Sequence, residues 1–146
     1  MTPFRFRLAR LQHWQQQLCR TEEGKLKQCL AAMAETQRKL EHLAARCAST
    51  EQDLSTQPRI TPSDLRALAD FRRRAQHDRL NLQREQISRQ AALATQQENL
   101  LRERRKLEAL DKLHARALAQ HRMAEDRELD AMGLESFLAA RWRAAE

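Results

Sequence analysis

The chain lacks the side chains from which β-sheets are built. Its 146 residues include no valine and no tyrosine, the only isoleucines are Ile60 and Ile87, and aromatic residues make up 4% of the chain. Strands favour β-branched and aromatic side chains, whereas the abundant leucine, alanine, arginine, glutamine and glutamate lose little rotamer freedom in a helix. The composition therefore predicts an all-α fold and excludes a compact α/β enzyme.

Several kinds of targeting and crosslinking segment are also missing. No stretch approaches the roughly 20 consecutive apolar residues of a transmembrane helix, and we expect no secretory signal because the N-terminus lacks an apolar run. The three cysteines, Cys19, Cys29 and Cys47, include no Cys-x-x-Cys pair. An odd number of widely spaced cysteines favours a reducing cytoplasm over a disulfide framework.

The residues offer no catalytic arrangement. With two glycines in the chain there is no glycine-rich phosphate loop, and no serine, histidine and aspartate are spaced as a nucleophile with its base. His114 and His121 lie two helical turns apart, about 10 Å, which is too far to share one metal ion without other ligands. We therefore expect no catalytic, cofactor-binding or metal-binding residues, no cofactor, and no enzymatic activity.

One segment carries clear signals for the end of one helix and the start of another. Pro58 disfavours the helical conformation of Gln57, so a preceding helix ends there. Thr61 is a good N-cap residue, Pro62 suits the first helical position, and Asp64 is spaced to return a hydrogen bond to the cap, as in a capping box. These signals predict two helices joined by a short turn.

The predicted architecture is a single coiled-coil domain over residues 1–146, an antiparallel hairpin with a longer second helix. We expect helix one over about 4–56, a turn at 57–61, and helix two over about 62–142. Apolar residues recur in steps of three and four along both helices. The expected stripe of helix one is Phe4, Leu8, Leu11, Leu18, Leu26, Leu30, Met33, Leu40, Ala44, Cys47 and Leu54. That of helix two is Leu65, Leu68, Ala75, Leu82, Leu93, Leu100, Leu107, Leu110 and Ala117.

The seam between the helices is thin, because polar residues stand where an optimised coil would have leucine. Arg72, Arg79, Gln86 and Gln96 occupy such positions. The sequence therefore predicts a marginally stable hairpin.

A short turn fixes which residues of an antiparallel hairpin meet. The residue numbers of facing partners should add to about 118, which places Leu43 near Ala75, Cys47 near Phe71 and Phe4 near His114. Everything beyond about residue 115 is then expected to have no partner within the chain. This overhang is rich in large apolar residues, which predicts a binding surface: Leu118, Met123, Leu129, Met132, Leu134, Phe137, Leu138 and Trp142.

The net charge of +7 arises from 27 Lys and Arg against 20 Asp and Glu. Residues 1–20 contain Arg5, Arg7, Arg10 and Arg20 and no acid. The later basic clusters at 72–74 and 104–106 are interleaved with acids, as on a solvated helix face. Because arginine and phenylalanine together are typical of interface anchors, the N-terminal cluster points to a protein partner and no nucleic acid is expected.

Three segments together resemble the FliJ family of the flagellar type III export apparatus. The opening Pro3-Phe-Arg-Phe-Arg-Leu-Ala-Arg-Leu11 resembles the N-terminus of these proteins. Arg104-Arg-Lys-Leu-Glu-Ala-Leu-Asp-Lys-Leu-His114 resembles their leucine-rich segment, and Glu128-Leu-Asp130 followed by Phe137 resembles their acidic end with its trailing aromatic residue. The resemblance extends over the whole chain, including the break near residue 60 and the longer second helix.

The resemblance implies a cytoplasmic central stalk, peripheral to the inner membrane at the base of the flagellum and needed for motility. Its paired termini would insert into the hexameric export ATPase, and other surfaces would contact the export gate membrane protein and the flagellar export chaperones. The residues expected at the ATPase ring are Phe4, Arg5, Arg7, Leu8, Arg10, Leu11, Leu129, Met132, Phe137 and Leu138. Those expected at the export gate are Leu43, Cys47, Phe71 and Ala75.

Three alternatives stay open at the level of sequence. The chain is also compatible with the equivalent stalk of a virulence injectisome, although the Phe-Arg-Phe-Arg start favours the flagellar version. From a different class, a basic coiled-coil nucleic-acid-binding protein would show tight, strongly salt-dependent binding. The overhang could also self-associate, which would make the protein a homodimer.

Overall fold

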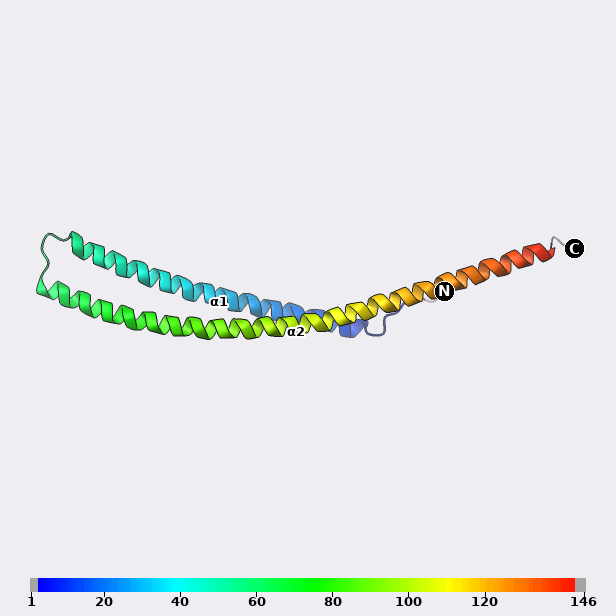
Figure 1. Ribbon diagram of the computed structural model, residues 1–146, viewed down its shortest axis with the longest axis horizontal. Helices are drawn as coiled ribbons and strands as arrows, with labels where there is room; N and C mark the ends of the chain where they lie inside the picture. Colours follow the sequence, from blue (N-terminus) through cyan, green and yellow to red (C-terminus); the bar gives the residue numbers. More distant parts are fainter. Residues whose placement is uncertain (1–2, 144–146) are drawn as a thin grey trace. The chain divides into compact units, whose positions relative to one another are not determined.

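The computed structural model describes residues 3–143, and over this range it contains two helices and no strand. Helix α1 runs from Ala9 to Thr56 and helix α2 from Pro62 to Arg143, with 48 and 82 residues (Figure 1). The all-α prediction and the longer second helix are confirmed. The chain divides into two compact units. We call the described parts of Met1–Arg20 and Arg102–Glu146 the terminal unit, and Thr21–Leu101 the loop unit.

The connection between the helices follows the predicted chemistry. Residues 57–61 are outside the helices, and α2 begins directly after Thr61. The Asp64 carboxylate accepts hydrogen bonds from the backbone N–H of Thr61 at 2.9 Å and from its hydroxyl at 2.6 Å, while the Asp64 N–H donates to the Thr61 hydroxyl at 3.3 Å. The Thr61 hydroxyl and backbone N–H hold the pKa of Asp64 below its ordinary value. This reciprocal capping box satisfies N–H groups that a helix start would leave unpaired.

In the loop unit, the C-terminal part of α1 packs against the N-terminal part of α2 in antiparallel order. The Gln96 side chain donates to the Glu22 carboxylate at 2.5 Å, Gln86 donates to Gln37 at 3.2 Å, and the Arg72 guanidinium donates to Glu51 at 2.7 Å. The residue numbers of these pairs add to 118, 123 and 123, so the register agrees with the predicted value of about 118 to within about a turn and a half of one helix.

The buried stripe of α1 differs in detail from the leucine stripe expected from sequence. Leu30 is 49% exposed, whereas its neighbour Cys29 is half-buried and Thr36 is fully buried. Thr36 satisfies its hydroxyl by donating to the Ala32 carbonyl at 3.2 Å. Glu23 and Ala32 are half-buried at the side of a row of buried and half-buried side chains of α1 in this unit. The row itself recurs without a break in steps of three and four: Glu22, Leu26, Cys29, Met33, Thr36, Leu40, Leu43, Cys47, Thr50 and Leu54.

The expected stripe is also wrong at two further leucines. Leu11 is 45% exposed and Leu65 is 54% exposed, although both were expected to face the partner helix. In α2 the buried apolar side chains are Ala75, Leu93, Leu100 and Leu110, each at most 9% exposed. These four belong to the predicted seam of helix two. The seam thus combines few fully buried apolar residues with many half-buried ones.

In the terminal unit, the start of α1 packs against the beginning of the Arg102–Glu146 stretch of α2. Gln15 and Cys19 are 3% and 5% exposed, and Leu110 of α2 is 9% exposed. The Gln12 side chain donates to Asp111 at 2.5 Å. Within residues 3–143, neither helix carries a window apolar enough to cross a lipid bilayer.

Candidate interaction surfaces

The first described residues form a short non-helical strap, defined here as residues 3–8. Helix α1 was expected to begin at about Phe4, but it begins at Ala9. The Ala9 N–H donates to the Phe6 carbonyl at 3.1 Å, which turns the chain into the helix. The Phe4 ring lies 5.6 Å from His114 and 5.4 Å from His121, and the Phe6 ring lies 4.8 Å from His114, all in edge-to-face geometry. These ring contacts bind the strap to α2.

The strap covers more of α2 than a helix of equal length would. A helix advances 1.5 Å per residue, whereas extended chain covers up to about 3.3 Å per residue. Phe4 therefore reaches His121 as well as the predicted partner His114. The prediction that α2 is uncovered beyond about residue 115 is wrong by nearly three turns, because Leu118, His121 and Glu125 are half-buried.

The N-terminal residues predicted to contact an ATPase ring separate into two sets. Phe4 and Leu8 are half-buried, and Phe4 is already engaged by the two histidines. Arg5, Arg7, Arg10 and Leu11 are exposed. The strap thus presents its arginines outward while its aromatic rings pack on α2.

From residue 126 to residue 143, every side chain of α2 is exposed. Among the predicted ring residues, Leu129, Met132, Phe137 and Leu138 are 52%, 59%, 62% and 46% exposed. The sequence also placed Leu134 and Trp142 in the overhang, and these are 63% and 77% exposed. A helix that exposes this many large apolar side chains is typical of an interaction site.

Four of these apolar residues share one side of the helix. We call Leu134, Phe137, Leu138 and Trp142 the C-terminal apolar face. At about 100° per residue, the centre of this face lies roughly a third of a turn away from His121, the last α2 residue in contact with the strap. The face is therefore not a continuation of the seam that packs on the strap. Leu129 and Met132 point to the other side of the helix.

The loop unit contains a groove between its two helices, with a volume of about 840 Å³. Three of the four residues predicted for the export gate, Leu43, Cys47 and Ala75, line it. Phe71 is half-buried and is not among the residues that line this groove. The remaining apolar lining of the groove consists of Leu40, Ala44 and Ala48. Leu40 and Ala44 were expected in the stripe of helix one but not at a partner surface, and Ala48 was not predicted in either.

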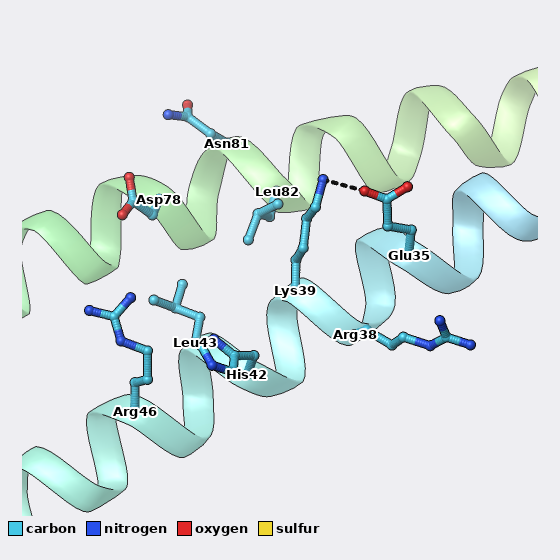
Figure 2. Close-up of a pocket in the computed structure, with 9 residues that line it drawn as sticks. All are labelled: Glu35, Arg38, Lys39, His42, Leu43, Arg46, Asp78, Asn81 and Leu82. Atoms are coloured by element: carbon cyan, nitrogen blue, oxygen red, sulfur yellow. Dashed lines mark ion pairs between the residues drawn. The ribbon is translucent and has the colours of Figure 1, made fainter.

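A second groove of the loop unit shares Leu43 and has a volume of about 580 Å³. Figure 2 shows Leu43 of α1 and Leu82 of α2 directed into the space between the helices. Lys39 forms an ion pair with Glu35 at 2.8 Å at its edge (Figure 2). This hydrogen bond lowers the pKa of Glu35 and raises that of Lys39. Both side chains are at least half exposed, so the pair adds little to stability.

The polar seam residues form a paired arrangement that occurs in both units. In the terminal unit, the Gln15 amide donates to the Glu103 carboxylate at 2.6 Å and to its backbone carbonyl at 3.1 Å, and Lys106 donates to the same carboxylate at 2.7 Å. The hydrogen bonds from Lys106 and Gln15 lower the pKa of Glu103.

The loop unit repeats this arrangement with the helices exchanged. Gln96 donates to the carboxylate and backbone carbonyl of Glu22 at 2.5 and 3.1 Å, and Lys25 donates to Glu22 at 2.7 Å. The same pattern, Gln-x6-Glu-x2-Lys, occurs once in each helix, starting at Gln15 in α1 and at Gln96 in α2. Because the helices are antiparallel, the glutamine of each pattern pairs with the glutamate of the other. Gln96 had been interpreted only as a defect in the seam.

Over residues 3–143 no three His, Cys, Asp or Glu side chains are grouped so that they could hold a metal ion. The candidate surfaces are therefore the strap, the C-terminal apolar face and the two grooves of the loop unit. Comparisons of the chain with protein-family models, with curated proteins and with solved structures find no match.

Proposed function

We propose that this protein is a central-stalk component of a flagellar type III export apparatus. In this role its terminal unit inserts into the ring of the hexameric export ATPase and promotes ring assembly and ATP turnover. Support comes from the resemblance of three sequence segments to the FliJ family and from the all-α hairpin with its longer second helix. The equivalent stalk of a virulence injectisome is the alternative within the same class.

The observation that carries the proposal is the composition of the terminal unit. It combines the exposed arginines Arg5, Arg7 and Arg10 with the exposed apolar residues of 126–143. Buried apolar anchors with arginine around them supply most of the binding energy in protein interfaces. Both halves of such an interface belong to the same compact unit.

A single asymmetric helical pair in a sixfold ring must meet the six subunits unequally. A ligand shifts an equilibrium between conformations by the difference in its affinity for them. Unequal contacts of the strap arginines and of Leu129, Met132, Phe137 and Leu138 would therefore favour one arrangement of ring states over the others. Because these contacts span neighbouring subunits, they would also favour ring assembly.

We further propose that the larger groove of the loop unit is the surface for the export gate membrane protein. Leu43, Cys47 and Ala75 line this groove, and an apolar floor with a charged rim suits an apolar side chain or a helix of a protein partner. The Glu51–Arg72 ion pair, 2.7 Å long, lies on the rim. Export chaperones would bind elsewhere on the exposed helix faces, leaving the terminal unit available to the ring. The proposed location is the cytoplasmic side of the inner membrane at the flagellar base.

The test is phosphate release by the cognate export ATPase, with and without this protein. We expect stimulation at a substoichiometric ratio, together with a larger fraction of assembled hexamer in sedimentation. The variant Arg5→Glu, Arg7→Glu, Arg10→Glu should abolish stimulation while circular dichroism stays strongly helical. The matched control is Arg59→Glu, Arg66→Glu, Arg84→Glu, which makes the same charge change in the loop unit and should stimulate normally.

Two results would contradict the stalk proposal. One is no stimulation by the unaltered protein. The other is equal loss of stimulation in the control variant, which would show a dependence on net charge alone. Tight binding to DNA or RNA that weakens steeply with salt would instead favour a nucleic-acid-binding protein.

A further inference from the structure

The C-terminal apolar face has a charge pattern that identifies a partner for it. The acids Asp126, Glu128 and Asp130 precede the face together with one base, Arg127, Glu135 lies within its sequence range, and Arg141 and Arg143 lie at its end, all of them exposed. The segment is therefore acidic in its first half and basic in its last turn. A helix with this order of charges is complementary to an antiparallel copy of itself, because each acidic half then lies beside a basic end.

The apolar residues allow the same pairing. If two copies of the segment lie antiparallel with Ser136 at the centre, Leu134 of each copy faces Leu138 of the other, as in the layers of an antiparallel coiled coil. The same register brings Arg141 of one copy alongside Asp130 of the second copy, and both residues lie on the side of the helix that carries the apolar face. A parallel pair would place acids beside acids and arginines beside arginines, which is unfavourable.

A small residue leaves room beside the large side chains in this register. Ala131 lies on the same side of the helix, about 45° from the centre of the face at about 100° per residue. Antiparallel packing on this face lets the exposed Phe137 and Trp142 rings contact the neighbouring copy. Burial would remove from water side chains that are 46% to 77% exposed in the single chain.

We propose that the protein forms an antiparallel homodimer through the C-terminal apolar face. This inference goes beyond the stalk function, because it concerns the free protein and does not require a ring. Where both hold, the second copy occupies part of the surface that the ring would bind, so dissociation of the dimer precedes insertion. Leu129 and Met132, which point to the other side of the helix, stay outside the dimer contact.

The first experiment is sedimentation equilibrium of the full chain over the micromolar range. We expect a concentration-dependent equilibrium between monomer and dimer. The variant Leu134→Asp, Leu138→Asp should be monomeric throughout, with helical circular dichroism retained. The matched control Leu129→Asp, Met132→Asp introduces the same charges and removes similar apolar area in the same exposed segment, and it should dimerise as the unaltered chain does.

The second experiment tests the orientation of the copies. Asp130→Cys protein is mixed with Arg141→Cys protein, oxidised, and mapped by peptide mass spectrometry so that the native cysteines are told apart. Both positions lie on the side of the helix that carries the C-terminal apolar face, so the antiparallel dimer predicts mixed disulfides that join position 130 to position 141. A monomer at every concentration, loss of the dimer in the Leu129 and Met132 control, or disulfides joining 141 to 141 would each overturn the proposal. Because the ATPase is absent from both experiments, neither result depends on the stalk function.

Discussion

Within the terminal unit, residues 102–125 of α2 are covered by the start of the chain and residues 126–143 are not, and the two parts differ in how their apolar and polar residues are used. In the covered part, only Leu110 is a fully buried apolar residue, and Glu103 and His114 share its side of the helix. The uncovered part, residues 126–143, contains six large apolar side chains that are all at least 46% exposed. Large apolar residues make up six of the 18 residues at 126–143 but only five of the 24 residues at 102–125, so they are more frequent where no part of the described chain packs. The hairpin holds together with modest apolar burial, and the surplus apolar surface is available for binding.

The covered part makes up for its thin apolar seam with specific polar pairs. Glu103 is held by Gln15 and Lys106, and its side chain is only 17% exposed. A shift of one helix along the other would leave the buried Gln15 amide without its acceptor and Glu103 with only Lys106 of its own helix, and an unpaired buried amide costs more than the hydrogen bond itself contributes. Polar residues at seam positions are known to specify register at some cost in stability. In residues 126–143 no such hydrogen bond to the other helix occurs, so nothing in this part of the described chain prevents it from packing against another molecule.

The contrast between the covered and uncovered parts of α2 predicts the largest change in the free energy of unfolding for a substitution at Leu110. Leu110→Ala removes a side chain that is 9% exposed and should lower the free energy of unfolding by about 2 kcal/mol, near the lower limit for buried leucine because the seam is narrow. The matched change in the uncovered part is Leu129→Ala, at a side chain that is 52% exposed.

The measurement is urea unfolding followed by circular dichroism at 222 nm. Leu129→Ala should change the free energy of unfolding by less than about 0.5 kcal/mol, as surface substitutions do. Equal effects of the two substitutions would show that residues 126–143 pack within the chain, and the contrast between the two parts would be lost.

Sequence reasoning predicted most reliably what local chemistry decides. The end of α1 at Thr56 and the start of α2 at Pro62 were predicted to the residue, because Pro58, Thr61, Pro62 and Asp64 act through their immediate neighbours. The start of α1 was missed by five residues. Nothing local in Phe-Arg-Phe-Arg ends a helix, and the strap conformation depends on His114 and His121, which are more than a hundred residues away in the chain.

The choice of buried residues could not be made from one helix alone. From Leu26 to Met33, both Leu30 and Cys29 continue a pattern of threes and fours, and only the partner helix decides that Cys29 faces inward while Leu30 is 49% exposed. The register argument did bring Leu43, Cys47 and Ala75 together, and they line one groove. Their role at an export gate, like the ring contacts, remains a prediction because geometry alone does not name a partner.

A smaller effect is expected from the Gln15 hydrogen bonds. Gln15→Ala leaves the Glu103 carboxylate with Lys106 and water, and should lower the free energy of unfolding by about 1 kcal/mol. Gln12→Ala is the control, because Gln12 also donates across the helices, to Asp111, but at an exposed site. Its effect should stay below about 0.5 kcal/mol. If Gln12→Ala lowers the free energy of unfolding as much as Gln15→Ala does, burial does not explain the contribution of the Gln15 hydrogen bonds to stability.

The smallest predicted effect is a difference in pH dependence. The hydrogen bonds from Lys106 and Gln15 lower the pKa of Glu103 in the folded chain, so the unfolded chain binds this proton more readily. The resulting stabilisation is fully present above the ordinary glutamate pKa, about 4.3, and is lost as the pH falls through the lowered value. Glu103→Gln keeps an acceptor for Gln15 and removes the titration, so its stability should decline less between neutral and acid pH than that of the unaltered chain.

The comparison for this experiment is Glu108, whose pKa is also lowered, by its hydrogen bond and charge pairing with Lys112. Glu108 and Lys112 are 63% and 68% exposed, so salt should screen most of their interaction. In thermal unfolding at several pH values, Glu108→Gln should match the unaltered chain once salt is added. Glu103→Gln should still differ from the unaltered chain in its pH dependence when salt is added, because the hydrogen bond from the Gln15 amide is not an interaction between two charges. If salt removes the difference from the unaltered chain for both variants, Glu103 is stabilised by Lys106 alone, and the buried glutamine serves only to fill space in the seam.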